Sequence, residues 1–384
     1  MHLLRLSLSF AGMTQLVAAL PRMTGDLPKL SALKCRDNKP PELLGDLLHL
    51  PDEQLTPVGK AIKGILLLED TAGGGAQDLS TRYTAPGPLD SPECSSDTCC
   101  VWKYVAEEME NDFKGETGRC TIFAREAVRL GFHDAGTWSK TQGGGGADGS
   151  FLLAGEIARP NNRGLEEVNN KMWAYYGKYH KYGASMADII QMGATVGAVV
   201  CPFGPRIRSF VGRNDSEIPA PEGRLPEASQ GVGPLIELFE DKTVPLRDLV
   251  ALVGAHSVGQ QRFEDHTKAG DPQDSTVGVW DTTFFRETVR NDTAKRIFKF
   301  HSDVSIATHH ESQSLWRSFS DPVSGQSLWN DVSPGYAHQP ENVKFRANNV
   351  HVGLCSSLYP PQCPWCPAYQ QLEGVHRGSA HARW

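Results

Sequence analysis

The pattern of apolar and polar positions predicts helices through most of the chain beyond about residue 99. Apolar side chains between Trp102 and Phe113 recur at helical spacing, and Ser185 forms a capping pattern with Asp188 ahead of the apolar run 189–200. Turn-forming Pro, Gly, Asn and Asp residues separate these segments. The pattern therefore predicts a mostly α-helical protein with long loops and few strands, and further helices over 165–176, 246–257, 282–290, 292–300 and 311–319.

Both ends of the chain differ in composition from this helical part. Residues 1–20 carry one arginine and an apolar body, which favours a signal peptide cleaved near Ala19 over a buried core helix. Residues 21–93 are rich in Pro, Gly, Asp and Leu, and predict an N-terminal extension or propeptide with short helices over 43–50 and 61–68. Residues 356–384 form a Pro-rich tail, in which Cys363 and Cys366 lack the context of a redox motif and favour a structural disulfide.

Charge and cysteine content narrow the class of protein. The 384 residues have a formal net charge of -7, which argues against binding to nucleic acid. The sequence contains no uninterrupted run of 18 or more apolar residues, so we do not expect a membrane-spanning helix in the mature protein. Nine cysteines fit an oxidised, extracellular protein, and Asn214 and Asn291 begin possible glycosylation motifs. We therefore expect a secreted, disulfide-bonded glycoprotein.

Two histidine-bearing segments suggest the chemistry. Arg129 and His133 are four residues apart in the predicted helix 124–134, so their side chains lie on one face. An imidazole that takes a proton and a cation that stabilises negative charge suit acid–base catalysis. The predicted helix 246–257 ends near His256, which could ligate iron on the opposite side. The alternatives are a core histidine that has found a hydrogen-bond partner and a core helix with one solvated arginine.

Three motifs in this order resemble the plant-type haem peroxidase superfamily. They are Arg-x-x-Phe-His-Asp at 129–134, Gly-Ala-Asp-Gly-Ser at 146–150 and Leu-Val-Gly-Ala-His-Ser at 252–257. The resemblance is greatest to the secreted fungal branch that includes lignin and manganese peroxidases. It covers residues 94–355 and implies two helical halves that sandwich one haem b. It also implies hydrogen peroxide as the oxidant, small phenols or aromatic amines as donors, two calcium ions and a monomer.

The resemblance also implies a role for each matching residue. His256 would ligate the haem iron through one ring nitrogen and donate a hydrogen bond from the other to Asp303. This carboxylate would make His256 a more electron-rich ligand. His133 would act as the acid–base group, Arg129 would stabilise developing charge, and Phe132 would pack over the haem. Asn162, held by Glu156, would fix the tautomer of His133, with Asn161 as the rival for this role.

Calcium sites would follow each of the two histidines. Carboxylate, hydroxyl and carbonyl oxygens are the ligands that calcium prefers. A turn-rich loop without an ion is the alternative. By resemblance, the first ion would be bound by Asp134, Gly146, Asp148 and Ser150, and the second by Ser257, Asp274, Thr276, Val279 and Asp281.

The chain also departs from the family pattern. Ile122, Glu126 and Arg262 stand where manganese peroxidases have three carboxylates, and Ala251 stands where lignin-type enzymes have a surface tryptophan. Gln273 replaces an aromatic residue beneath the haem, and Arg262 is a candidate partner for a haem propionate. We therefore expect a peroxidase for small aromatic donors. The rivals are a manganese- or lignin-type enzyme and a haem- or calcium-binding protein that has lost turnover.

Matching cysteines imply three disulfides in the same family pattern. The resemblance implies Cys120–Cys201, Cys99–Cys355 and Cys94–Cys100, with Ser314 in place of one family cysteine. Cys35, Cys363 and Cys366 remain without a family partner.

Overall fold

The computed structural model describes residues 83–206 and 209–332, together with residues 47, 49–55, 59–60, 63–64 and 67. All of them belong to one unit, Pro41–Trp384. The expected signal peptide, the tail 356–384 and most of the segment 21–82, including most of its two expected helices, lie outside the described residues. None of the described helices is both long and apolar enough to cross a membrane.

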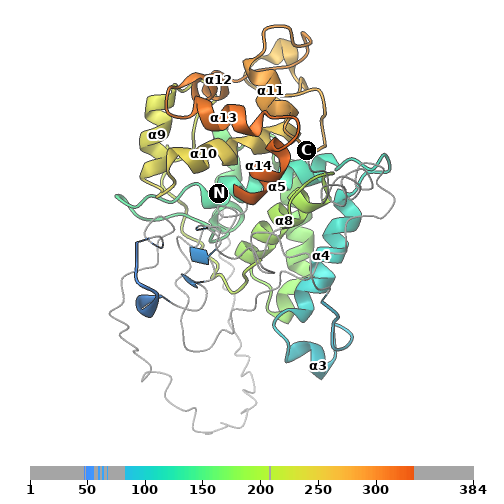
Figure 1. Cartoon of the computed structure of the whole chain (residues 1–384). Helices are drawn as coiled ribbons and strands as arrows, with labels where there is room; N and C mark the ends of the chain where they lie inside the picture. Colours follow the sequence, from blue (N-terminus) through green and yellow to red (C-terminus); the bar gives the residue numbers. More distant parts are fainter. Residues whose placement is uncertain are drawn as a thin grey trace, which may run out of the picture. The chain divides into compact units, whose positions relative to one another are not determined.

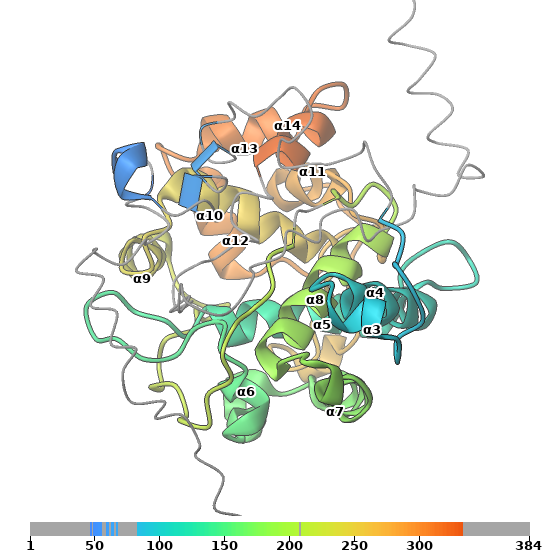
Figure 2. The ribbon, with the colours of Figure 1, turned by 90° about the horizontal axis from the view of Figure 1, so that it is seen from below.

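The described elements form two groups of helices, which Figures 1 and 2 show from two directions. The first group comprises α3 (Pro92–Ser95), α4 (Cys100–Phe113), α5 (Ile122–Ala135), α6 (Ser150–Leu153), α7 (Glu166–Tyr179) and α8 (Met186–Val200). The second comprises α9 (Val232–Glu240), α10 (Leu246–Val253), α11 (Thr283–Val289), α12 (His301–Thr308), α13 (Gln313–Phe319) and α14 (Gly325–Val332).

Short 3-10 turns connect these helices, and extended pairing is almost missing from the described part of the chain. The turns are η1 (Asp52–Gln54), η2 (Glu156–Ala158), η3 (Pro160–Asn162), η4 (His180–Tyr182), η5 (Gly254–Val258) and η6 (His266–Lys268). Two isolated β-bridges, Lys114 with Cys120 and Gln260 with Pro272, are the extended pairings within these residues. The mostly α fold with two helical halves that the sequence predicted is confirmed.

Helix α5 is held against α8 by the most extensive helix–helix contact of the fold. Small residues bring the two backbones together: a Cβ at Gly197 would lie 2.5 Å from the backbone oxygen of Ala124. A Cβ at Gly131 would meet the Cβ of Ala194 at 2.4 Å. Thr121 caps the start of α5, because its hydroxyl accepts from the amide of Ala124. The position of α5, which carries Arg129 and His133, is therefore fixed by close packing.

The second group is built around large aromatic side chains. Trp316 and Trp329 are fully buried, and their indole nitrogens donate to the backbone oxygens of Phe285 and Ala251 at 2.9 Å each. Trp280 stacks on Trp329 with ring centroids 5.2 Å apart. Buried aromatic rings contribute large apolar area, and the two indole donors are satisfied. This cluster supports α10 and the η5 turn that follows it.

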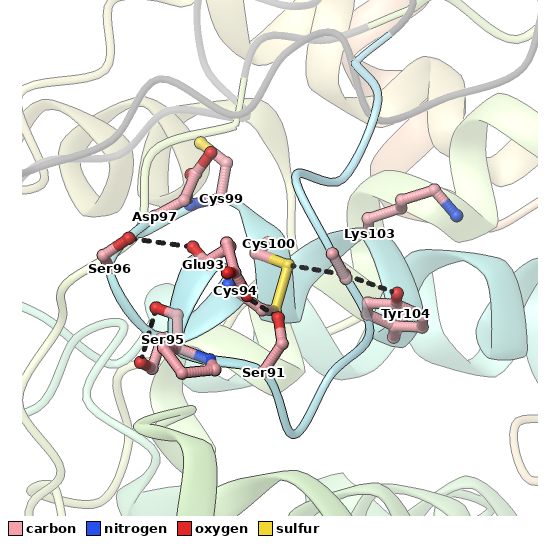
Figure 3. The surroundings of a disulfide bond; sticks show 12 residues. Ser91, Glu93, Cys94, Ser95, Ser96, Asp97, Cys99, Cys100, Lys103 and Tyr104 are labelled. Atoms are coloured by element: carbon pink, nitrogen blue, oxygen red, sulfur yellow. Dashed lines mark hydrogen bonds between the residues drawn. A yellow bond between two sulfur atoms is a disulfide. The ribbon is translucent and has the colours of Figure 1, made fainter.

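Disulfides connect the first group of helices at two places. Cys94 and Cys100 join α3 to the start of α4, and Figure 3 shows this bond beside Ser91 and Tyr104. Cys120 and Cys201 join the start of α5 to the end of α8. Both pairs agree with the sequence prediction. Cys99 is disulfide-bonded, but its expected partner Cys355 lies outside the described residues.

The segment before Cys94 contacts the helical domain. Tyr104 of α4 donates to the backbone oxygen of Gly87 at 3.0 Å, and Tyr83 donates to Asp97 at 2.7 Å. Tyr182 donates to the carboxylate of Asp90. Residues 83–93 therefore pack as part of the first half, although the sequence grouped them with the extension.

Several predicted elements differ from the observed ones. The predicted helix 246–257 is an α-helix only to Val253, and continues as the 3-10 turn η5 that carries His256. The predicted helix 292–300 is wrong: this segment forms turns, and the amide of Phe298 donates to the oxygen of Pro272 at 2.7 Å. Helix α12 begins only at His301. Helices α9 and α14 were not predicted.

Gly197→Ala should lower stability, because the added methyl overlaps a backbone oxygen that cannot rotate away. We expect a loss of about 1–3 kcal/mol in the free energy of unfolding. Gly177→Ala is the matched control, since Gly177 lies within α7 and nothing is within 4 Å of its Cβ position. This control should gain about 0.5–1 kcal/mol from helix propensity. Denaturant unfolding of both variants measures the contrast, and equal stabilities would contradict the close α5–α8 packing.

Candidate active site

A cavity of about 490 Å³ lies between the two helical halves. Its walls are largely apolar, with Val128 and Phe132 from α5, Phe239 from α9 and Leu252 from α10. The remaining lining includes both histidines of interest, His133 from the first half and His256 from the second. A concave, mostly apolar cavity with few polar groups is typical of a cofactor or small-molecule site.

His133 is buried in this cavity, and its ring forms a hydrogen bond with Asn162. Its Nδ1 lies 2.8 Å from the side-chain oxygen of Asn162, an acceptor that selects the tautomer protonated at Nδ1. Burial lowers the pKa of His133 to about 3, with the positive charge of Arg129 contributing, although the contact with Asn162 acts in the opposite direction. At neutral pH the ring is therefore uncharged, and Nε2 can accept a proton.

Arg129 lies one helical turn before His133, as the sequence predicted. Its guanidinium donates to the backbone oxygens of Arg163 at 2.8 Å and Asn161 at 2.9 Å. Burial lowers the pKa of Arg129, but a guanidinium stays protonated throughout the ordinary pH range. The two carbonyls come from the η3 turn and the residue after it, so this loop positions both Arg129 and the partner of His133.

Asn162, rather than its rival Asn161, contacts His133. The amide nitrogen of Asn162 donates to the backbone oxygen of Glu156 at 2.7 Å. The sequence analysis expected Glu156 to hold Asn162, which it does through its main chain. The Glu156 carboxylate instead accepts from the amide of Ala220 and from Arg159, each at 2.7 Å. The carboxylate therefore fixes the surrounding loop and reaches Asn162 only indirectly.

His256 has a different partner from His133. Its Nδ1 lies 3.1 Å from each carboxylate oxygen of Asp303, which is buried in the first turn of α12. Burial alone would lower the pKa of His256, but the charge and hydrogen bond of Asp303 outweigh it and the pKa is raised. Because Asp303 occupies Nδ1, Nε2 is the nitrogen left for a ligand.

Aromatic rings beyond the predicted site residues lie around both histidines. Phe239 of α9 stacks on Phe132 with centroids 6.3 Å apart, so a residue of the second half covers the ring beside His133. Phe284 and Phe300 meet the ring of His256 edge-on at 5.9 and 5.5 Å. The spacing of Leu235 and Phe239, one turn apart in an apolar segment, was a signal that could have predicted α9 and its contribution.

The first candidate calcium site gathers carboxylates, and among the described residues neither Asp134 nor Asp148 forms a salt bridge. Asp134 and Ser150 are almost fully buried, and the Asp134 carboxylate accepts from the amides of Gly149 and Phe151 at 3.2 and 3.3 Å. Burial, together with the negative charge of Asp148, raises the pKa of Asp134. Gly146 lies in the same loop, and its oxygen accepts from the amide of Asp148 at 2.8 Å.

The second candidate calcium site leaves oxygen atoms without partners. Asp274 and Ser257 are fully buried, and within the described part of the chain neither Oδ2 of Asp274 nor Oγ of Ser257 has a hydrogen-bond partner. Burial raises the pKa of Asp274 to about 8, and the charge of Asp281 adds to this effect. Thr276 bridges the two carboxylates at 3.2 and 3.1 Å, and its oxygen accepts from the amide of Val279 at 3.0 Å. Such buried, unpaired oxygens suit a hard cation.

The positions that differ from the manganese, tryptophan and haem-facing residues of the family line the cavity. Ile122, Glu126 and Arg262 lie in its wall, and one carboxylate oxygen of Glu126 is buried with no hydrogen-bond partner among the residues that the structure describes. Burial and the nearby Glu167 raise the pKa of Glu126 to about 7, although Arg262 and Arg125 favour its charged form. Gln273 is buried and its side-chain oxygen is also unpaired. Ala251 is buried, and its methyl side chain, unlike an indole ring, cannot be oxidised to relay electrons.

Comparison with known proteins agrees with this geometry. The family model described as Peroxidase matches residues 105–322. Ligninase C of Trametes versicolor is 32% identical over 68% of this chain and 76% of its own length. A peroxidase of Arthromyces ramosus is 31% identical over 69% of this chain and 77% of its own. Manganese peroxidase H4 of Phanerodontia chrysosporium is 29% identical over 60% and 66%. The chain therefore belongs to the peroxidase family and is a haem peroxidase, an oxidoreductase that acts on hydrogen peroxide.

Proposed function

We propose that the cavity between His133 and His256 is the catalytic centre, and that small phenols and aromatic amines are the reducing substrates. The observation that carries this proposal is the pairing of each histidine at Nδ1, with an amide oxygen in one case and a carboxylate in the other. We further propose that the protein is a secreted monomer. The disulfides Cys94–Cys100 and Cys120–Cys201 support secretion into an oxidising environment, and they do not bear on the oligomeric state.

The residues present fit one haem b. The cavity opens onto both histidines, its walls are apolar, and Nε2 of His256 is the ligand atom that Asp303 leaves for iron. When bound, the haem supplies the redox chemistry, giving two electrons to peroxide and regaining them singly from donors. Asp303 makes His256 a more electron-rich ligand, while Phe132 packs over one face of the cavity.

The protein's own groups move the proton of the peroxide. With Nδ1 donating to Asn162, Nε2 of neutral His133 takes a proton from one peroxide oxygen and returns it to the leaving oxygen, which departs as water. Arg129, held by two backbone carbonyls, stabilises negative charge as the O–O bond breaks. Apolar walls exclude water, so both interactions act in a medium of low polarity.

Two calcium ions would stabilise this arrangement. The first set, Asp134, Gly146, Asp148 and Ser150, directly follows His133 in the sequence. The second set, Ser257, Asp274, Thr276, Val279 and Asp281, begins at the residue after His256. The buried unpaired oxygens of Asp274 and Ser257 support the second ion, and the mutually repelling Asp134 and Asp148 support the first.

His133→Leu should slow the reaction with peroxide by about 10²–10⁴-fold, because no group remains to transfer the proton. Stopped-flow absorbance of the haem-loaded protein mixed with peroxide measures this rate, and haem content should be unchanged. His266→Leu is the matched control, since His266 is exposed and lies outside the cavity lining. A near-normal rate in His133→Leu would remove His133 from the mechanism.

Calcium should raise thermal stability, and more so at high pH. The pKa of Asp274 in the folded protein without a cation is about 8, against an ordinary value of 3.8, so ionising this group costs increasing stability as pH rises between these values. A bound calcium ion removes the free-energy cost of ionising Asp274. At lower pH, where Asp274 is protonated, calcium must first displace the proton. We expect a larger calcium-induced rise in Tm at about pH 8.5 than at about pH 5.5.

Asp274→Asn should reduce the pH dependence of this calcium effect, since Asp134 at the first site still contributes, while Asp292→Asn, an exposed carboxylate elsewhere, should leave it unchanged. Scanning calorimetry with and without calcium measures both variants. The absence of calcium from metal analysis of the purified protein would contradict the proposal.

Manganese(II) should be a poor donor, while a simple phenol reacts. A tight manganese site needs several oxygen donors, but Ile122 offers none and Arg262 adds a positive charge beside Glu126. Steady-state kinetics with manganese(II), a phenol and a non-phenolic aromatic compound measure this preference. The double variant Ile122→Glu, Arg262→Asp should gain saturable manganese oxidation. Saturable oxidation by the unaltered protein at micromolar manganese would show that this assignment is wrong.

A further inference from the structure

A cluster of metal-ligating side chains lies in the turn between α12 and α13, outside the cavity lining. His309, His310 and Glu311 follow one another there, and one ligand atom from each lies within 4.8 Å of the others. The rings of His309 and His310 are 4.3 Å apart at centroids, and Nε2 of His310 is 3.8 Å from the Glu311 carboxylate. Two imidazoles and a carboxylate therefore lie close enough together for small side-chain rotations to bring them onto one ion.

The backbone of this turn is held in place. The oxygen of His309 accepts from the amides of Ser312 at 3.2 Å and Gln313 at 2.9 Å. Ser312 is buried, and its hydroxyl donates to the oxygen of Ile306 within α12. The three ligand side chains thus project from a fixed main chain, so a bound ion would need to order side chains alone. Preorganisation of this kind favours binding.

The side chains themselves are free to close on an ion. Those of His310 and Glu311 are 77% and 63% exposed, so their heads stay solvated and can rotate. The contact given up is weak: the amide of Glu311 donates to Nδ1 of His309 at 3.4 Å. Ligands of a shared tetrahedral zinc ion lie about 3.4 Å apart, which requires movements of about an ångström here.

We propose that His309, His310 and Glu311 bind a divalent transition metal ion that prefers imidazole, of the zinc, nickel or copper class. Imidazole nitrogen favours these ions over calcium and magnesium, and one carboxylate completes a three-ligand set with water in the open positions. The ion would join the end of α12 to the start of α13. Because Asp303 lies on α12, this site stabilises the helix that holds the partner of His256, and it does so independently of peroxidase activity.

Zinc binding to the haem-loaded full chain tests the proposal. The protein is freed of zinc by gel filtration without a chelator, since a chelator would also remove calcium from the proposed calcium sites. Isothermal titration with zinc chloride should show one site that is missing in His309→Ala/His310→Ala. Zinc should also raise the Tm of the unaltered protein and leave that of the variant unchanged.

Two further variants distinguish the site from other histidines of the chain. His180→Ala removes an exposed histidine of the first half and should keep the zinc site. His310→Ala alone, at a side chain that is mostly exposed, should weaken binding without changing the zinc-free Tm. Equal zinc stoichiometry and equal zinc-induced Tm shifts in all variants would overturn the proposal, because the bound ion would then lie elsewhere.

Discussion

The close approach of α5 and α8 is the constraint on which the site depends. Helices packed through Gly131, Gly197 and Ala194 leave no room for a methyl group between them, so neither helix can slide without a clash. Since Arg129 and His133 are on the face of α5 that lines the cavity, their positions follow from this contact. Large residues at the interface would have given apolar area but a less exact register. The cavity geometry therefore rests on residues that have almost no side chain.

Two histidines in one cavity acquire opposite properties from their partners. Both are affected by burial, which disfavours a charged ring. Asn162 offers His133 a neutral acceptor, and the nearby Arg129 lowers its pKa further, so the ring stays available as a base. Asp303 offers His256 a full negative charge, which reverses the effect of burial on the pKa. The proposed division between proton transfer and metal ligation would thus be set by the second residue of each pair rather than by the histidine itself.

Local motifs made part of this structure predictable, and tertiary contacts determined the rest. The spacing of Arg129 and His133 fixed their shared face, and the Ser185 cap located the start of α8. The change from α-helix to 3-10 helix at Gly254 could not be predicted, because the apolar pattern continues across it. The prediction of a helix over 292–300 was wrong because the backbone amide of Phe298 donates to the oxygen of Pro272, a residue distant in the sequence. Glu156 acts through its main chain, which side-chain matching cannot anticipate. Phe239 was missed because no element was predicted for residues 232–240, which form α9.

The bond between Cys120 and Cys201 connects three segments that are far apart in the sequence. It closes a loop whose ends are 81 positions apart, which removes about 4.5 kcal/mol of unfolded-chain entropy on the loop-closure account. At its two ends, the amide of Cys120 donates to Gly278, and the oxygen of Pro202 accepts from Trp280. Oxidation of a single cysteine pair therefore brings together the beginning of one helix, the end of another and the loop that precedes Asp281. One covalent link between α5 and α8 therefore also fixes the loop that leads to Asp281, so the first helical group and this loop keep one relative position.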